Sequence, residues 1–465
     1  MDGRNHSYRP LTEEVLQRIR EAVGDKALIL DHQAREPFGK DATASCCLPE
    51  AVVEATTVEQ VEALLKLANE VRFPVTPRGT GTGLAGGAIP VFGGVTLSLE
   101  RMNRIMRIDR ANLVAVVEPG VVNGDLKKAA RELGLFYPPD PASFDTCSLG
   151  GNAATNAGGA SCVKYGTTRD YVLGLEAVLP TGDRITTGVQ TRKGVVGYDL
   201  TRLLVGSEGT LGVITRLILK LIPLPPAVST LVAFFPDLPS AMHGVTRILS
   251  KGYTPCALEF LDRHCLDLVG DLLPFEGVRG AGTFLLVEAD GAPRSVEREI
   301  EEMGEVCLEA GAGQAFLAPD SVKRSRMWDV RKEVSLRIEQ DASLYVPEDV
   351  VVPLGRISEL VEGLPELESR FGVRIYSFGH AGDGNIHLNF TSHSADSDMQ
   401  VQGAIEAVLD RVLAMGGTVS GEHGIGFVKR HFMARELCAE SLRLQREIKR
   451  VFDPNGILNP GKLFE

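Results

Sequence analysis

The segment Arg78-Gly79-Thr80-Gly81-Thr82-Gly83-Leu84-Ala85-Gly86 decides the fold of the N-terminal half of this 465-residue chain. From Gly81 onward it matches G-x-G-x-x-G, and it follows a short apolar strand, as a Rossmann dinucleotide loop would. A Rossmann fold also needs a helix directly after the loop. Here the chain continues with the residues Gly87-Ala88-Ile89-Pro90-Val91-Phe92-Gly93-Gly94, whose glycines and proline exclude a helix. The loop can still offer backbone N–H groups and hydroxyls to a pyrophosphate, although a plain glycine-rich turn explains this segment equally well.

Two further loops of small residues follow in the same half. One reads Ser148-Leu149-Gly150-Gly151-Asn152-Ala153-Ala154-Thr155-Asn156-Ala157-Gly158-Gly159-Ala160, and the other reads Gly206-Ser207-Glu208-Gly209-Thr210-Leu211-Gly212-Val213-Ile214-Thr215. Small side chains let a backbone approach a large planar ligand closely. Three such loops without a Rossmann helix predict one site for an extended dinucleotide.

The C-terminal half carries two segments rich in histidine and glycine. They read Gly379-His380-Ala381-Gly382-Asp383-Gly384-Asn385-Ile386-His387-Leu388-Asn389 and Ser420-Gly421-Glu422-His423-Gly424-Ile425-Gly426. The first predicts two strands joined by a hairpin turn at 383–385, which would bring both of its imidazoles to one ion. Together the segments offer the ligand types of a divalent metal site and a spare acid/base. Two ordinary turn histidines are the alternative explanation of the hairpin.

Composition narrows the class of protein. Hydrophobic residues make up 44% of the chain and charged residues 24%, which is typical of a globular protein of two or three domains. The net charge of −12 argues against nucleic-acid binding. Eight scattered cysteines without a C-x-x-C array give no sign of an iron–sulfur cluster or structural zinc. With no apolar run of about 18 residues, we expect a cytoplasmic protein that meets a membrane only through a partner or its surface.

Periodicity predicts two domains. Helices are expected at 11–23, 58–70 and 125–133, and the proline-rich stretch 223–226 reads as a boundary. After it, strands at 230–235, 255–260, 283–288 and 313–317 alternate with helices at 239–250 and 294–310 in a ferredoxin-like pattern. We therefore predict a first domain over 1–222, completed by 420–465, and a substrate or cap domain over 223–419 that carries the histidine hairpin.

The three glycine loops resemble those of the flavin domain in vanillyl-alcohol-oxidase-type (PCMH-type) FAD proteins. With the two histidine segments, the chain resembles the FAD-linked 2-hydroxy-acid dehydrogenases, a branch that includes D-lactate dehydrogenase, D-2-hydroxyglutarate dehydrogenase and the D subunit of glycolate oxidase. The resemblance extends from about Leu48 to Lys462, with the motifs in family order. It implies an α+β protein with a PCMH-type FAD-binding domain and a ferredoxin-like substrate domain.

The resemblance also implies cofactor contacts. The pyrophosphate would lie on Arg78, Gly79, Thr80, Gly81 and Thr82, and the ribityl chain and isoalloxazine would lie beside Ser148, Gly150, Gly151, Ala154, Asn156, Gly158 and Gly159. Glu208 and Ile214 would hold the adenosine side, and Asn459 would close over the flavin. The first loop lacks the histidine that bonds covalently to flavin in some relatives, so FAD should be noncovalent.

By the same resemblance, His380, His387 and Glu422 would ligate a divalent metal, and His423 would be the catalytic base. Zinc, manganese or iron suits two histidines and a carboxylate. Arg331, Ser335 and Asn389 match positions that contact substrate, although a surface arginine is an equally good explanation of Arg331 from sequence alone. Relatives acting on dicarboxylates carry a lysine where this chain has Val346, after Tyr345, which favours a short acid.

These roles imply oxidation of a small D-2-hydroxy acid, D-lactate or glycolate, with hydride transfer to flavin N5. Electrons would leave to an electron-transfer flavoprotein, an iron–sulfur subunit or a quinone, and the chain could form a homodimer. The alternatives are a D-2-hydroxyglutarate dehydrogenase and a noncatalytic FAD relay subunit of a larger complex.

Overall fold

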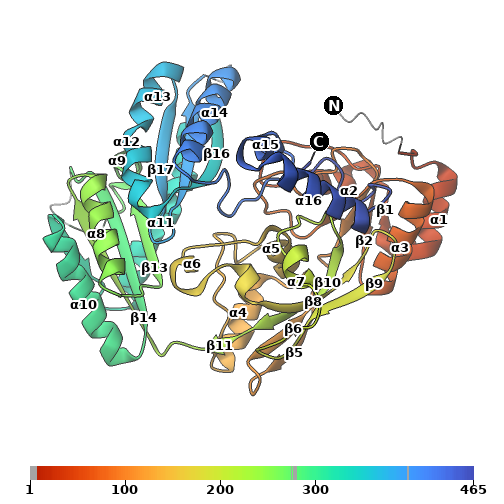
Figure 1. The fold of residues 1–465 in the computed structure, drawn as a ribbon, viewed down its shortest axis with the longest axis horizontal. Helices are drawn as coiled ribbons and strands as arrows, with labels where there is room; N and C mark the ends of the chain where they lie inside the picture. Colours follow the sequence, from red (N-terminus) through yellow and green to blue (C-terminus); the bar gives the residue numbers. More distant parts are fainter. Residues whose placement is uncertain (1–7, 274, 276–279, 395–396, 465) are drawn as a thin grey trace. The chain divides into compact units, whose positions relative to one another are not determined.

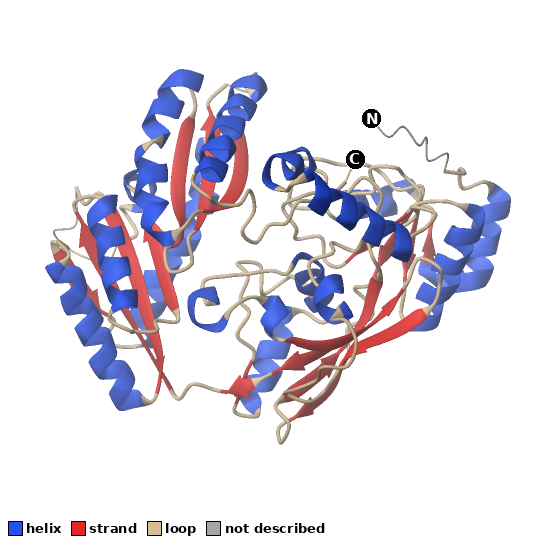
Figure 2. Cartoon of the chain, in the orientation of Figure 1, coloured by secondary structure: helices blue, strands red, loops and turns tan. Residues whose placement is uncertain are grey.

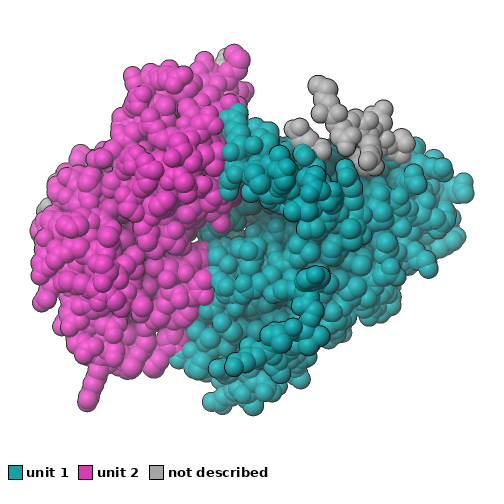
Figure 3. Space-filling model, in the orientation of Figure 1, with its two compact units in different colours: residues 1–158, 167–224, 422–465 teal, residues 159–166, 225–421 magenta. Residues whose placement is uncertain are grey.

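The computed structural model describes residues 8–273, 275, 280–394 and 397–464. The chain forms two compact units, coloured separately in Figure 3. Unit 1 comprises Met1–Gly158, Thr167–Leu224 and Glu422–Glu465, and unit 2 comprises Gly159–Gly166 and Pro225–Gly421. Both boundaries lie within two residues of the predicted ones, but Gly159–Gly166 packs in unit 2 although the predicted first domain contained it.

The described residues of unit 1 form two larger sheets and one two-stranded pair, and Figures 1 and 2 show how they are arranged within this unit. The first has the order β1-β2-β4-β3, in which β2, β4 and β3 are parallel and β1 is an antiparallel edge strand. The second is antiparallel, with the order β5-β6-β10-β8-β9. The strands are β1 (Leu28–Ile29), β2 (Ala51–Glu54), β3 (Val75–Arg78), β4 (Val95–Ser98), β5 (Ile105–Asp109), β6 (Val114–Val117), β8 (Val172–Val178), β9 (Arg184–Gly188) and β10 (Val213–Lys220), with the small pair β7 (Leu135–Phe136) and β11 (Ile222–Pro223).

The sequence predicted three helices of unit 1, which are α1, α3 and α4, and the first two begin at capping side chains. Helix α1 (Glu13–Val23) begins after Thr12, which accepts a hydrogen bond from a backbone N–H of the first turn. Helix α3 (Val58–Val71) begins with a complete capping box between Thr57 and Gln60. Helix α4 spans Asn123–Glu132, and the others are α2 (His32–Arg35), α5 (Leu149–Thr155), α7 (Leu200–Leu204), α15 (Met433–Glu436) and α16 (Ala439–Phe452).

The core of unit 1 needs the end of the chain. Ile457 and Leu458 are fully buried in the same apolar cluster as α1, α3 and the parallel sheet. Val75 of β3 bridges to Leu458, and its N–H donates to the carbonyl of Ile457. The C-terminal segment is therefore an integral part of this unit.

Unit 2 is built on one antiparallel sheet of seven strands among the described residues, with the order β15-β12-β14-β13-β17-β18-β16. The first four have the strand order of a β-α-β-β-α-β ferredoxin-like unit, as predicted. The hairpin β17–β18 and β16 extend this sheet beyond the predicted pattern. The strands are β12 (Ala227–Phe235), β13 (Ala257–Leu261), β14 (Thr283–Gly291), β15 (Gln314–Leu317), β16 (Leu344–Val351), β17 (Arg374–His380) and β18 (Asn385–Ser392).

Helices cover both faces of the unit 2 sheet. Side chains of α9 and α11 pack with one face in a cluster that includes Phe284, Tyr376 and Phe378. The opposite face packs on α8 and α10, and α14 contacts β16 and β18. The helices are α6 (Cys162–Tyr165), α8 (Leu238–Ser250), α9 (Arg263–Val269), α10 (Pro293–Glu309), α11 (Ser321–Asp341), α12 (Ile357–Glu362), α13 (Leu364–Phe371) and α14 (Asp398–Ala414). Within the described part of the chain, no helix combines the length and apolarity needed to cross a bilayer.

Candidate functional site

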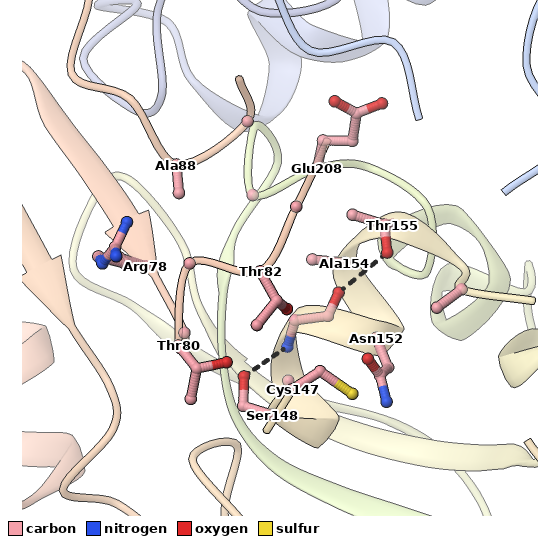
Figure 4. A pocket seen from close by; sticks show the side chains of 18 of the residues that line it. Arg78, Thr80, Thr82, Ala88, Cys147, Ser148, Asn152, Ala154, Thr155 and Glu208 are labelled. Atoms are coloured by element: carbon pink, nitrogen blue, oxygen red, sulfur yellow. Dashed lines mark hydrogen bonds between the residues drawn. The ribbon is translucent and has the colours of Figure 1, made fainter. Parts of the chain in front are cut away.

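The glycine loops line one cavity of about 250 Å³ inside unit 1. Figure 4 shows side chains from all three loops gathered around it. The predicted cofactor residues that line it are Arg78, Gly79, Thr80, Gly81, Thr82, Ser148, Gly150, Gly151, Ala154, Gly158, Glu208 and Ile214. Two residues of the C-terminal segment, Glu422 and His423, also line this cavity.

The first loop leaves β3 without forming a helix, as predicted. Gly81 has a φ of +74°, and a Cβ there would lie 2.0 Å from Nη2 of Arg78, so only glycine fits the turn. Arg78 is buried, which lowers the pKa of its guanidinium, and its Nη1 donates to the carbonyl of Lys40. Among the described residues, Nε of Arg78 and Oγ1 of Thr80 have no hydrogen-bond partner although both are buried. These atoms suit a ligand rich in acceptor oxygens, such as a pyrophosphate.

The second loop differs from its predicted form, because its first residues form helix α5. Ser148 caps this helix by accepting the N–H of Gly151 at 3.3 Å, and the small residues that follow tolerate helical backbone. A Cβ on Gly150 would lie 2.5 Å from Cβ of Pro119, so glycine here allows close packing of the backbone. Helix α5 ends at Asn156, which has a φ of +55°.

Three of the predicted cofactor residues do not line the cavity: Asn156, Gly159 and Asn459. The side-chain oxygen of Asn156 instead accepts the hydroxyl of Thr167 at 3.0 Å and the N–H of Arg169 at 2.9 Å. Gly159 belongs to unit 2. Asn459 has a bridging role within unit 1, described next.

The third loop ties the cavity to the C-terminal segment through Glu208. Its carboxylate accepts the N–H of Ile425 at 2.7 Å and that of Gly426 at 2.6 Å. Burial raises the pKa of Glu208, while these two hydrogen bonds oppose the rise. The Asn459 amide donates to the carbonyls of Glu208 and Gly87 at 2.8 and 3.0 Å. The segment that begins with Glu422 and His423 is thus held to two of the glycine loops.

The histidine hairpin forms in unit 2 as predicted. Its turn requires glycine at position 384. The φ of Gly384 is +85°, and a Cβ there would lie 2.2 Å from the carbonyl oxygen of Val352. His380 ends β17 and His387 lies on β18, and their Nε2 atoms are 3.4 Å apart. Two nitrogens that bind one tetrahedral zinc ion at 2.0–2.1 Å are about 3.3 Å from each other. The imidazoles are therefore already spaced as a pair of metal ligands.

A carboxylate that the sequence reasoning missed completes this cluster. Oε1 of Glu259, on β13, lies 2.5 Å from Nδ1 of His380, and Oε2 accepts Nε–H of Arg331 at 2.8 Å. Burial alone would raise the pKa of Glu259, but the charges and hydrogen bonds of His380 and Arg331 outweigh it and lower the pKa. The available signal was a single acidic residue in the apolar strand Ala257–Leu261.

The three predicted substrate residues all belong to unit 2. Arg331, on α11, is not a surface arginine: its side chain is 12% exposed and lies over the ring of Phe378 at 4.4 Å. Ser335 lies one turn further along the same helix and is half-buried. Oδ1 of Asn389 accepts the hydroxyl of Tyr345 at 3.0 Å, and its buried Nδ2 has no partner in the part of the chain that the structure describes.

The expectation that Val346 faces the substrate is wrong, because β16 places its side chain on the other face of the sheet. Val346 pairs with Phe390 and lies against α14, where it lines a hollow with Met399. Tyr345 precedes it and therefore faces the side of Asn389.

The chain just before Glu422 is anchored within unit 2. The fully buried carboxylate of Asp349, on β16, accepts the hydroxyl of Ser420 at 3.1 Å and the N–H of Gly421 at 2.6 Å. Glu422 is the next residue, so only one peptide bond separates it from this anchor.

Comparison with known proteins agrees with this architecture. Residues 49–188 match the FAD binding domain family, and residues 224–463 match the family of FAD linked oxidases, C-terminal domain. The chain is 39% identical to D-lactate dehydrogenase of Anaerostipes hadrus, over 98% of both chains. It is 36% identical to glycolate oxidase subunit GlcD of Bacillus subtilis, over 98% of this chain and 97% of the relative. The fold is also that of p-cresol methylhydroxylase with bound substrate, with a TM-score of 0.80 at 20% identity over 97% of this chain and 96% of the other. The chain therefore belongs to the FAD-linked oxidases and is an FAD-binding oxidoreductase.

Proposed function

We propose that this protein oxidises a small D-2-hydroxy acid, D-lactate or glycolate, to the 2-oxo acid. The observation that carries the proposal is that His423 lines the same cavity of unit 1 as the three glycine loops. A histidine imidazole can accept a hydroxyl proton at neutral pH. The names of the relatives, D-lactate dehydrogenase and glycolate oxidase subunit, support this substrate class.

In this proposal FAD is noncovalent and supplies the two-electron acceptor. The chain's own residues bind and orient it. Arg78 and Thr80 donate to the pyrophosphate with the buried polar atoms that lack partners among the described residues. The backbone of α5 approaches the ring system closely because its residues are small. His423 takes the proton of the substrate hydroxyl.

A divalent metal, Zn²⁺, Mn²⁺ or Fe²⁺, would be held by His380, His387 and Glu422 and would supply Lewis acidity that lowers the pKa of the substrate hydroxyl. The spacing of the two Nε2 atoms fits this role. Arg331 and Nδ2 of Asn389, which has no hydrogen-bond partner among the described residues, would bind the substrate carboxylate, with Ser335 beside them. Tyr345 fills the space next to Asn389, which favours a short acid over D-2-hydroxyglutarate.

Electrons would then pass to a separate acceptor: an electron-transfer flavoprotein, an iron–sulfur subunit or a quinone. We place the protein in the cytoplasm, where it would reach the inner membrane face only through such a partner. A homodimer is compatible with this arrangement. The competing function is a noncatalytic FAD relay subunit, which would have no use for a base in the flavin cavity.

Anaerobic bleaching of the flavin absorbance at 450 nm, with a panel of D- and L-2-hydroxy acids, tests the proposal. D-lactate or glycolate should bleach it, and His423→Asn should slow the bleaching by roughly 10²- to 10⁴-fold with FAD still bound. His431→Asn, an exposed histidine of the same segment, is the matched control. Unchanged bleaching by His423→Asn would refute the base, and no bleaching by any acid would favour the relay subunit.

The metal is tested separately with the same assay. Dialysis against a chelator should abolish bleaching by the acid, and added Zn²⁺ or Mn²⁺ should restore it. Bleaching that continues at the original rate in protein shown to be free of metal would refute the metal role.

A further inference from the structure

The cluster around Glu259 includes side chains that are not among the predicted metal ligands, namely Glu259 itself and Arg331. Glu259 is 1% exposed and lies in a strand whose other residues are apolar. A buried carboxylate is costly unless it is paired, and here each oxygen has its own partner: His380 on one side and Arg331 on the other. The three side chains come from β13, β17 and α11, all within unit 2.

We propose that Glu259, held by Arg331, is a positioning residue that preorganises His380 for the metal. This inference rests on the proposed metal site. With a carboxylate accepting its Nδ1–H, the imidazole of His380 is fixed in the tautomer whose Nε2 carries no proton and can act as a ligand. That Nε2 lies 3.4 Å from Nε2 of His387, which is the spacing of two ligands on one ion.

Arg331 gains a role that the sequence did not indicate. Its Nε is committed to Glu259, and its guanidinium is stacked over Phe378 at 4.4 Å. Both contacts fix the arginine, and the fixed arginine in turn fixes the carboxylate. Any contact of Arg331 with the substrate would use its remaining N–H groups.

The neighbouring strand supplies a matched control. Glu288, on β14, is 7% exposed and is likewise held by an arginine of α11: Nε and Nη2 of Arg324 donate to its two oxygens at 2.8 and 2.9 Å. Its carboxylate also accepts hydrogen bonds from Trp328, Thr230 and Sγ of Cys256, and no histidine hydrogen bond to it is among those described. Glu288→Gln therefore disturbs a buried carboxylate–arginine pair without touching a metal ligand.

The experiment measures Zn²⁺ affinity of the FAD-loaded protein by competition with a chromophoric chelator, together with the visible absorption of the Co²⁺-substituted protein. Glu259→Gln should weaken Zn²⁺ binding by roughly 10- to 100-fold and change the Co²⁺ spectrum. Glu288→Gln should keep the affinity and the spectrum of the wild type. FAD content, which depends on unit 1, should be unchanged in both.

Wild-type affinity and spectrum in folded Glu259→Gln protein would overturn the inference while leaving the metal site intact. Equal weakening in Glu288→Gln would also overturn it, since any damaged pair would then suffice. If Glu259→Gln does not fold, Glu259→Asp, which keeps the charge but withdraws the carboxylate by one methylene, must show the weakened binding. Absence of Zn²⁺ binding by the wild type would refute the metal site itself, and with it the role of Glu259.

Discussion

Replacing Gly81 by alanine should release FAD, and the structure allows the size of the effect to be worked out. At a φ of +74° an L-residue costs about 1–2 kcal/mol relative to glycine. The new Cβ would lie 2.0–2.5 Å from three atoms of the Arg78 guanidinium, which must therefore move. A displaced guanidinium would lose a charge-assisted hydrogen bond to the pyrophosphate, worth about 1.5–3 kcal/mol.

We expect both costs to fall on FAD binding, because the bound cofactor would hold the loop in this conformation. A combined cost of about 2.5–5 kcal/mol raises the Kd for FAD by roughly 60- to 4,000-fold. The Kd is measured by quenching of flavin fluorescence on titration into apoprotein, and FAD content by absorbance at 450 nm. The control is Gly134→Ala, where φ is +70° and a Cβ would meet nothing within 4 Å. An unchanged Kd in Gly81→Ala protein would refute the assignment of this loop to the pyrophosphate.

Three further predictions follow from single side chains. Glu208→Gln removes one of the two carboxylate oxygens that accept the backbone N–H groups of Ile425 and Gly426, at a cost of about 1–3 kcal/mol. The Tm measured by differential scanning fluorimetry should therefore fall by several degrees. An unchanged Tm would show that these hydrogen bonds do not stabilise the fold. Burial lowers the pKa of Lys462 to about 8, so the unfolded state binds more protons above that pH. The free energy of unfolding of the wild type, measured in urea relative to Lys462→Met, should therefore rise by about 2.5 kcal/mol as the pH rises from 8 to 10.5, and a constant difference would refute it. Tyr345→Ala empties the space beside Asn389. The ratio of kcat/KM for a 2-hydroxy acid with a longer side chain to kcat/KM for D-lactate should rise at least about tenfold. An unaltered ratio would show that Tyr345 does not line the substrate site.

Local chemistry made much of this protein predictable. The glycines and proline after Gly81 excluded a Rossmann helix, and the structure has none there. Alternation along 386–390 put His387 on the opposite face of β18 from the fully buried Ile386 and Leu388. The ferredoxin-like strand order followed from two β-α-β units.

What could not be predicted depended on partners distant in sequence or on a shift of one residue. Glu259 is 121 residues from His380, and no spacing rule connects them. Val346 was matched to the lysine of relatives acting on dicarboxylates because a resemblance gives a position but not a face, and a shift of one residue along a strand reverses the face. Asn156 could be expected at the flavin from its place in a glycine loop, yet its αL backbone and its bonds to Thr167 and Arg169 give it a local role at the end of α5.

The burial of Ile457 and Leu458 in unit 1 has a consequence for the order of events on the ribosome. These residues close the core beside Val75, and they are synthesised after every glycine loop and after the whole of unit 2. Unit 1 therefore cannot complete its core until residues 457 and 458 have left the ribosome. FAD should bind only after that point, and a stop codon before residue 457 should yield a chain that contains every glycine loop but retains no flavin.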